Sequence, residues 1–126
     1  MSHPTSHMIG IRLRYPHRID EVKGRILCVA DAMDKDDEPF PEPVRNGIAS
    51  CLSPELEGGQ GSFVVIAGAF NYWSWEDAAE FSRRLSTSFT DCEVLHSCVE
   101  YQDECEPESG RPHCQMWFNG VPTSAV

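Results

Sequence analysis

Residues that could bind a metal ion gather in the last third of the chain: His96, Cys98, Cys105, His113 and Cys114. Thiolate and imidazole groups are the ligands that zinc prefers in structural sites. Such sites usually contain two cysteines separated by two to four residues, and no pair of cysteines in this chain has that spacing. The spacing favours scattered thiols and histidines over a metal centre, and we expect neither a metal nor another cofactor.

A cysteine beside a histidine could also form a nucleophilic dyad. If residues 92–101 form a strand, alternation puts His96 and Cys98 on the same face. No GxSxG turn, no family-type cysteine signature and no recognisable oxyanion loop accompanies them. The glycine-rich run 58–61 precedes a strand instead of joining a strand to a helix, so it is not placed to cradle a phosphate. Catalysis is therefore the weaker interpretation.

Aromatic residues cluster around a three-residue connection between an apolar run and a helical pattern. Phe70, Tyr72, Trp73 and Trp75 lie there, and ligands gather at the carboxyl ends of strands in open α/β sheets. Tryptophan and tyrosine next to acids such as Glu76 match the composition of protein-binding hot spots. Tyr72 and Trp73 are predicted either to anchor a partner or to cover the end of the sheet, because amphipathic rings serve both purposes.

The 126 residues carry a net charge of −10, which is unevenly spread. Residues 1–30 hold five Lys and Arg against two acids, whereas residues 31–126 hold five against eighteen. Binding to nucleic acid or to an anionic membrane is therefore not expected, whereas a basic protein would suit this charge. The acids predicted to contact such a partner are Asp36, Asp37, Glu38, Glu76, Asp103, Glu104 and Glu106. The alternative is an acidic surface that only keeps the chain in solution.

Hydrophobic periodicity predicts four strands. Strict alternation of apolar and polar residues over 8–15 indicates a strand with one wet face, with Arg12 on the solvent side. Continuous apolar sequence without a charge over 63–70 indicates a central strand that is buried on both faces. Two further strands are expected at 92–101 and 113–118.

Two longer segments keep helical spacing. Residues 75–89 place their apolar side chains on one stripe, and Ser74 with Asp77 forms a capping signal in front of them. Residues 19–33 also keep this spacing, although Gly24 weakens a helix by about 1 kcal/mol. A turn followed by a short strand is the alternative for this second segment.

These elements define one domain over 8–120. With a short helix over 43–52, the order is β-α-α-β-α-β-β, which predicts an α+β fold: a two-layer sandwich with a mixed four-stranded sheet and helices mainly on one face. Residues 1–7 are interpreted as a disordered leader or cloning remnant, and residues 121–126 as a flexible tail.

The six cysteines are expected to be reduced thiols in a cytoplasmic protein. The chain is long enough to build its own core and shows no export signal, so disulfide bonds are not needed to hold it together. Cys28 and Cys51 lie in apolar periodic segments typical of buried free thiols. No run of apolar residues approaches the length of a membrane span.

In size, acidity and α+β character, the chain resembles bacterial toxin-immunity proteins and phage-encoded inhibitors. The resemblance covers composition and size only, so no site residues are carried over from it. It implies a protein that neutralises a basic partner, a toxin or a nucleic-acid-processing enzyme, by occluding its functional cleft. The alternative is a small enzyme or ligand-binding domain with a pocket at the aromatic carboxyl end of strand 63–70.

Overall fold

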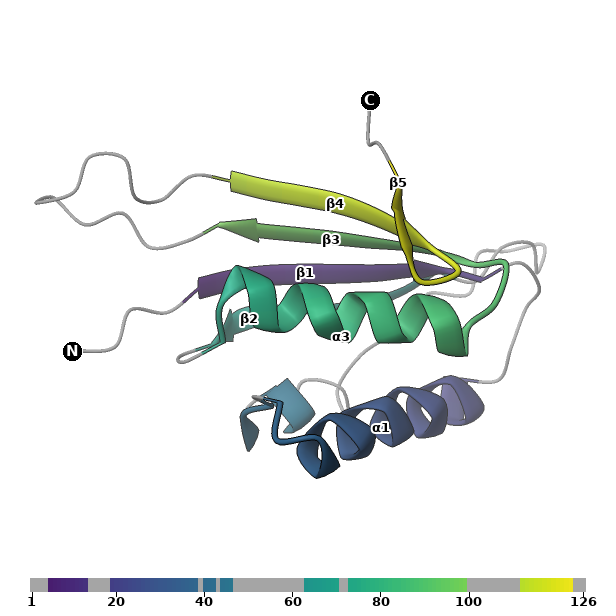
Figure 1. Cartoon of the computed structure of the whole chain (residues 1–126), viewed down its shortest axis with the longest axis horizontal. Helices are drawn as coiled ribbons and strands as arrows, with labels where there is room; N and C mark the ends of the chain where they lie inside the picture. The colour runs from purple at the N-terminus through teal and green to yellow at the C-terminus, as the bar shows by residue number, and fades with distance from the viewer. Residues whose placement is uncertain are drawn as a thin grey trace, which may run out of the picture.

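The computed structural model describes residues 5–13, 19–38, 40–42, 44–46, 63–70, 73–99 and 112–123. In this part of the chain, helices cover one face of a five-stranded sheet, which confirms the predicted α+β class (Figure 1). The strands are β1 (Thr5–Arg12), β2 (Phe63–Phe70), β3 (Glu93–Val99), β4 (Pro112–Phe118) and β5 (Val121–Thr123). The long helices are α1 (Ile19–Lys35) and α3 (Trp75–Ser88), and residues 44–46 add a short helical turn.

The sheet differs from the prediction in strand number, direction and order. Its order is β2-β1-β3-β4-β5 and every neighbouring pair is antiparallel, so the predicted mixed four-stranded sheet is wrong. β1 lies inside the sheet, whereas β2, predicted to be the central strand, lies at an edge. β1 and β2 were expected to be parallel because helical segments separate them, but they are neighbours that run in opposite directions (Figure 1). β2 and β3 are parallel, as expected for a helical crossover, but β1 separates them.

β1 shows the predicted alternation but begins earlier than expected. Its buried hydrophobic series is Ile9, Ile11 and Leu13. Arg12 faces solvent, as a period of two requires. The strand begins at Thr5, so residues 5–7 belong to the sheet and not to the predicted leader. Residues 1–4 lie outside the described part of the chain.

α1 confirms the helical interpretation of residues 19–33. Its buried face consists of Val22, Ile26, Val29, Ala30 and Met33. Gly24 is exposed, and a Cβ atom at this position would meet nothing within 4 Å. The intrinsic cost of this glycine, about 1 kcal/mol, is smaller than the gain from burying several large aliphatic side chains.

α3 begins where its capping signal predicts. The Asp77 backbone N–H donates to the Ser74 hydroxyl at 3.2 Å, and the Ser74 N–H donates to the Asp77 carboxylate at 3.2 Å. This reciprocal capping box satisfies two backbone donors that the first turn cannot pair internally. The helix buries Ala78, Phe81 and Leu85 against β3 and β4 and lies beside α1.

The predicted flexible tail contains a strand. Residues 121–123 pair with β4 as β5, through a two-residue turn at Asn119 and Gly120. Both turn residues have positive φ, 50° and 82°, which is the geometry that Asn-Gly hairpins favour. The Asn-Gly pair is thus a hairpin signal, and it explains why the chain continues as a strand where a flexible tail was predicted. Residues 124–126 lie outside the described part.

The C-terminus of α1 closes with a left-handed residue that is not glycine. Asp37 has φ 58°, the Glu38 N–H donates to the Met33 carbonyl at 2.9 Å, and the Asp37 N–H donates to the Asp34 carbonyl at 3.3 Å. These two bonds form a Schellman motif, in which glycine usually occupies the left-handed position. An aspartate therefore stands where the backbone favours glycine.

Asp37→Gly is expected to raise the free energy of unfolding by about 0.5–1 kcal/mol, because glycine adopts positive φ without the steric penalty of a Cβ atom. Asp37→Ala is the matched control, since it removes the same carboxylate but keeps the Cβ atom. Urea denaturation should give the alanine variant a free energy of unfolding about 1 kcal/mol lower than that of the glycine variant. Equal stability of the two variants would contradict a left-handed residue at this position.

Candidate functional site

Four of the acids predicted to contact a partner lie at one end of the helical layer. Asp36, Asp37 and Glu38 follow α1, and Glu76 lies in the first turn of α3. The two helices run in opposite directions, and the segment after α1 reaches the first half of α3, where Phe40 contacts Trp73 and Phe81 (Figure 1). An ion pair from Arg84 to Asp36 at 2.8 Å joins the two helices. The other predicted contacts, Tyr72, Asp103, Glu104 and Glu106, lie outside the described residues.

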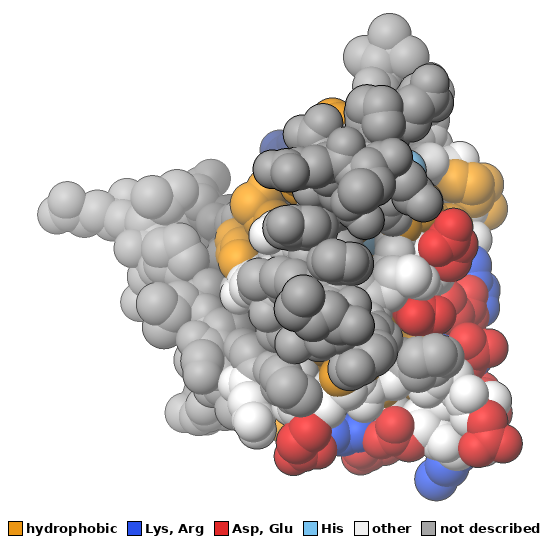
Figure 2. All heavy atoms as spheres, turned by 90° about the vertical axis from the view of Figure 1, so that its left-hand side faces the viewer, with side chains coloured by type: hydrophobic (Ala, Val, Ile, Leu, Met, Phe, Trp, Pro, Cys, Tyr) orange, Lys and Arg blue, Asp and Glu red, His pale blue; other side chains and the backbone are white. Residues whose placement is uncertain are grey.

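We call this region the acidic end. Its carboxylates are Asp31, Asp34, Asp36, Asp37, Glu38, Glu42, Glu76, Asp77 and Glu80, and its cations are Lys35, Arg45, Arg83 and Arg84. The three arginines bind acids of the same region. Figure 2, which faces this end of the molecule, shows acidic side chains along its lower and right-hand parts. Negative charge therefore exceeds positive charge here.

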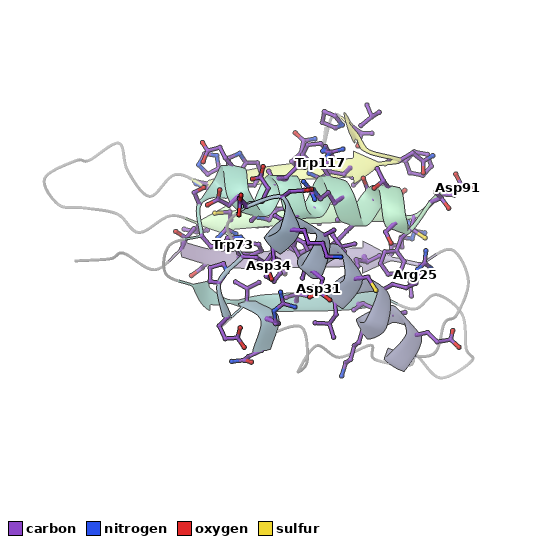
Figure 3. The ribbon with its side chains drawn as sticks, turned by 60° about the horizontal axis from the view of Figure 1, so that its bottom comes forward. Arg25, Asp31, Asp34, Trp73, Asp91 and Trp117 are labelled. Atoms are coloured by element: carbon purple, nitrogen blue, oxygen red, sulfur yellow. The ribbon has the colours of Figure 1, made fainter. Side chains whose placement is uncertain are left out.

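Part of this charge is neutralised inside the protein. Arg45 donates to Asp31 at 2.7 Å and also to Asp34, which raises the pKa of its own guanidinium. Both acids lie along α1 on the side toward Trp73, whereas Arg25 lies toward the opposite end (Figure 3). Glu80 accepts hydrogen bonds from Arg83 at 2.7 and 2.9 Å and from Arg84 at 2.8 Å, and these bonds lower its pKa to about 2.

Other acids of the acidic end keep their charge available. Within the described part of the chain, Asp37, Glu38, Glu42 and Glu76 enter no ion pair. Asp37, Glu42 and Glu76 are exposed, and Glu38 is half-buried. These carboxylates can act on a partner at a distance, because no bound cation cancels their field.

Trp73 is not the exposed anchor that the sequence suggested as one of its two roles. Only 1% of its surface is exposed, and it packs against Phe40 and Phe81 at ring-centroid distances of 5.7 and 5.8 Å. Its backbone carbonyl accepts a hydrogen bond from His7 Nε2 at 3.0 Å. The ring covers the end of the sheet, which was the other role considered. Phe40, an isolated apolar residue in an acidic segment, was the signal that this segment folds back onto the core.

The candidate metal ligands do not converge in the described part of the chain. His96 and Cys98 share one side of β3, as alternation predicts; this side faces the helices and both residues are buried, whereas Cys114 is exposed. The register places Cys98 directly between His7 and His113 on the neighbouring strands. The described residues contain no group of three or more His, Cys, Asp or Glu side chains that could hold a metal ion. Cys105 lies outside them.

The cysteines of the described part carry no disulfide. Cys28, Cys92, Cys98 and Cys114 are free thiols. Cys28 is exposed on α1, so its predicted burial is wrong. Helical spacing put it near the apolar stripe, but Val29 and Ile26 fill the buried positions on either side of it. Cys51 lies outside the described residues.

The sequence interpretation missed His7 and its contact with His96. His7 and His96 are 3% and 0% exposed, and His7 Nδ1 lies 3.0 Å from His96 Nε2. Trp75 stacks on His96 at a centroid distance of 4.4 Å and on His113 at 4.9 Å. Alternation in β1 could have predicted that His7 is buried, because position 7 continues the series of Ile9 and Ile11.

Hydrophobic side chains are exposed on the sheet face that the helices leave open. Met8 is 43% exposed and Val99 is 49% exposed. Met8 pairs with Ala67 on β2, and Val99 pairs with Pro112 on β4; both of these partners are exposed. We call Met8, Ala67, Val99 and Pro112 the apolar patch. It lies at the same end of the molecule as the acidic end, because β1 begins and β3 ends there (Figure 1).

No family model, curated protein or solved structure matches this chain. None of the helices in the described part combines the length and the apolar character that crossing a bilayer requires. The candidate site therefore rests on its own geometry. An excess of carboxylates in the helical layer and an apolar patch on the opposite face of the sheet lie toward the same end of the molecule (Figure 1).

Proposed function

We propose that the protein binds a basic protein through the acidic end and neutralises it by covering its functional cleft. The observation that carries the proposal is the convergence of exposed carboxylates from two segments, Asp37 and Glu42 after α1 and Glu76 at the start of α3. Complementary charge steers association and suppresses wrong partners. A toxin or a nucleic-acid-processing enzyme is a partner of this kind, because a cleft that binds phosphate groups is basic.

The backbone at Asp37 supports this proposal. A carboxylate is retained at a left-handed position where glycine would be more stable, and it lies in a region where it adds to like-charge repulsion. Residues in unfavourable backbone conformations cluster at functional sites. Binding a cation on a partner would give this carboxylate such a function.

The apolar patch supplies the contact area that charge alone lacks. Exposed charges act at long range and are screened by salt, whereas apolar groups contribute only after contact has excluded water. Met8 and Val99 are large enough for this purpose and belong to the sheet, so their backbone positions are already ordered. In this proposal they replace Trp73 as the anchors of the complex.

The described residues give no comparable support to a small-molecule pocket at the carboxyl end of β2. Trp73 and His7 fill the helix side of the sheet there, with ring centroids 4.9 Å apart. These closely packed rings occupy the space that a small-molecule pocket would need there. Binding of a protein is therefore the function that the described geometry supports best.

Neutralising two carboxylates of the acidic end is expected to slow association more than neutralising two elsewhere. The test variant is Asp37→Asn with Glu76→Gln, and the matched control is Glu21→Gln with Glu93→Gln at the opposite end. Both pairs change the net charge equally. Glu93 also pairs with Arg12 at 3.5 Å, but this exposed contact contributes little to stability. A basic protein is first captured on the immobilised parent chain and purified. At low salt it should associate several-fold more slowly with the test variant than with the parent or the control, and the association rate should depend less on salt.

The same kinetic experiment tests the apolar patch. Met8→Thr with Val99→Thr keeps the strand propensity but removes apolar contact, so it should speed dissociation and leave the association rate nearly unchanged. Equal effects of the two charge variants would show that the acidic end is not the binding site. Failure to capture any basic protein would contradict the proposed function.

A further inference from the structure

A hydrogen-bonded pair of buried imidazoles ties three segments of the chain together. His7 belongs to β1 and His96 to β3, and the two are joined at 3.0 Å. His7 also reaches the carbonyl of Trp73, which lies just before the capping residue of α3, at 3.0 Å. The pair therefore connects the start of β1, the middle of β3 and the entry to α3.

The carbonyl of Trp73 determines where the protons of this pair lie. A carbonyl oxygen only accepts, so His7 Nε2 must carry a hydrogen and donate it. In neutral His7 the other nitrogen, Nδ1, is then an acceptor, and it receives the N–H of His96 Nε2. His96 Nδ1 consequently carries a lone pair, and this atom is buried with no hydrogen-bond partner. The chain of donation runs from His96 to His7 to Trp73.

Among the residues that the structure describes, the groups around His96 offer no counter-charge. His7 comes from β1, His113 and the neutral Gln115 come from β4, and the indole of Trp75 comes from α3. The first turn of α3 also carries Glu76, which is exposed, and Asp77, whose carboxylate accepts from the Ser74 N–H. Burial first, and then the imidazoles of His7 and His113, lower the pKa of His96 to about 3.

An added proton cannot be accommodated without losing a hydrogen bond. On His96 Nδ1 it creates a donor in a buried position where no acceptor is present. On His7 Nδ1 it meets the N–H of His96, so His96 would have to change tautomer and put its hydrogen on the same orphan Nδ1 atom. Either route leaves a buried charge and an unpaired donor, which are the costliest polar states in a protein interior.

We propose that the His7–His96 pair is an acid-sensitive latch: in its neutral form it holds the start of β1 and the entry to α3 against β3, and protonation releases them. The latch operates in the free protein and requires no partner. It lies at the end of the molecule that carries the acidic end and the apolar patch, because β1 and α3 both begin there (Figure 1).

The direction of the pH effect follows from the difference between the folded and unfolded states. An unfolded histidine titrates near pH 6.5. Between pH 6.5 and 3, His96 therefore binds a proton in the unfolded chain but not in the folded one. Stability is complete above this range and falls as the pH falls through it. From pH 7 to pH 5 this one group should raise the unfolding equilibrium constant roughly 25-fold.

The test compares the parent chain with His96→Gln and, as a control, His113→Gln. The amide of glutamine can donate to neutral His7 or turn to accept from protonated His7, so it keeps the contact and removes the acid sensitivity. Hydrogen exchange at pH 7 and pH 5, corrected for intrinsic rates, should show loss of protection in the parent at residues 5–9, 73–78 and 94–98. The control should lose protection there as well, whereas His96→Gln should not.

Two results would overturn the latch. One is a parent chain whose protection at these residues is the same at both pH values, and the other is a His96→Gln variant as acid-sensitive as the parent. If this variant does not fold, ¹H–¹⁵N spectra of the parent imidazoles decide the question. At pH 7 they should show that both rings are neutral and carry hydrogen on Nε2. Titration of His96 near pH 6.5 without loss of hydrogen-exchange protection would contradict the proposal.

Discussion

Trp73→Ala is expected to lower the free energy of unfolding by about 3–5 kcal/mol, the usual cost of removing a buried aromatic side chain. The indole is 1% exposed and contacts Phe40, Phe81 and His7, so its loss leaves a cavity that these rings cannot fill without moving. Trp73→Phe keeps a ring at this place and should cost less. Chemical denaturation of the three proteins under the same conditions provides the measurement.

This variant also separates the two roles that the sequence allowed for Trp73. A surface anchor would leave stability nearly unchanged on truncation and would speed the dissociation of a partner. A core residue would lower stability and affect a partner only through the fold. Unchanged stability of Trp73→Ala would therefore contradict the burial described above and restore the anchor.

Glu80→Gln is expected to lower stability at pH 7 by on the order of 2–3 kcal/mol. The hydrogen bonds from Arg83 and Arg84 lower the pKa of Glu80 from 4.5 to about 2, so the folded state favours the charged carboxylate. For a carboxylate with a lowered pKa, this stabilisation is present above pH 4.5 and is lost as the pH falls toward 2. Urea denaturation of the parent and the variant should thus show a gap at pH 7 that narrows below pH 4.5.

Glu76→Gln is the matched control for Glu80→Gln, because it removes the same charge one turn earlier on α3. Glu76 is exposed and enters no ion pair among the described residues, so its loss should change stability by less than about 0.5 kcal/mol. A stability gap for Glu80→Gln that stays constant from pH 7 to pH 3 would mean that its charge is not what stabilises the fold. The histidine latch acts below pH 6.5 and the carboxylate only below pH 4.5, so the effect of the latch can be measured separately between pH 7 and pH 5.

The candidate site was predictable only in part. Acids such as Asp37 and Glu76 could be selected from composition, because the strongly negative segment and the helix start are local features of the chain. Their convergence could not, since it depends on α1 and α3 lying antiparallel and on the ion pair from Arg84 to Asp36. The phase of Arg12 puts Met8 on the wet face of β1, but the apolar patch was missed because it forms only where β1, β2, β3 and β4 pair across the sheet.

The sequence by itself determined the elements whose signals are local. Alternation in β1 and helical spacing in α1 each repeat within a few residues, and the capping box of α3 involves two residues three positions apart. Such patterns depend on backbone geometry and on which face is apolar, and both act over short distances along the chain. The inward faces of all three elements followed from them.

Only the tertiary structure decided the pairings between distant segments. Nothing local places β1 between β2 and β3, because an apolar run such as β2 can lie at the centre or at an edge of a sheet. The contact between His7 and His96 joins residues 89 positions apart, and Trp73 is buried by Phe40 from another segment. These contacts form only when the helices and the sheet pack as one core, since the burial that stabilises them is shared by the whole domain.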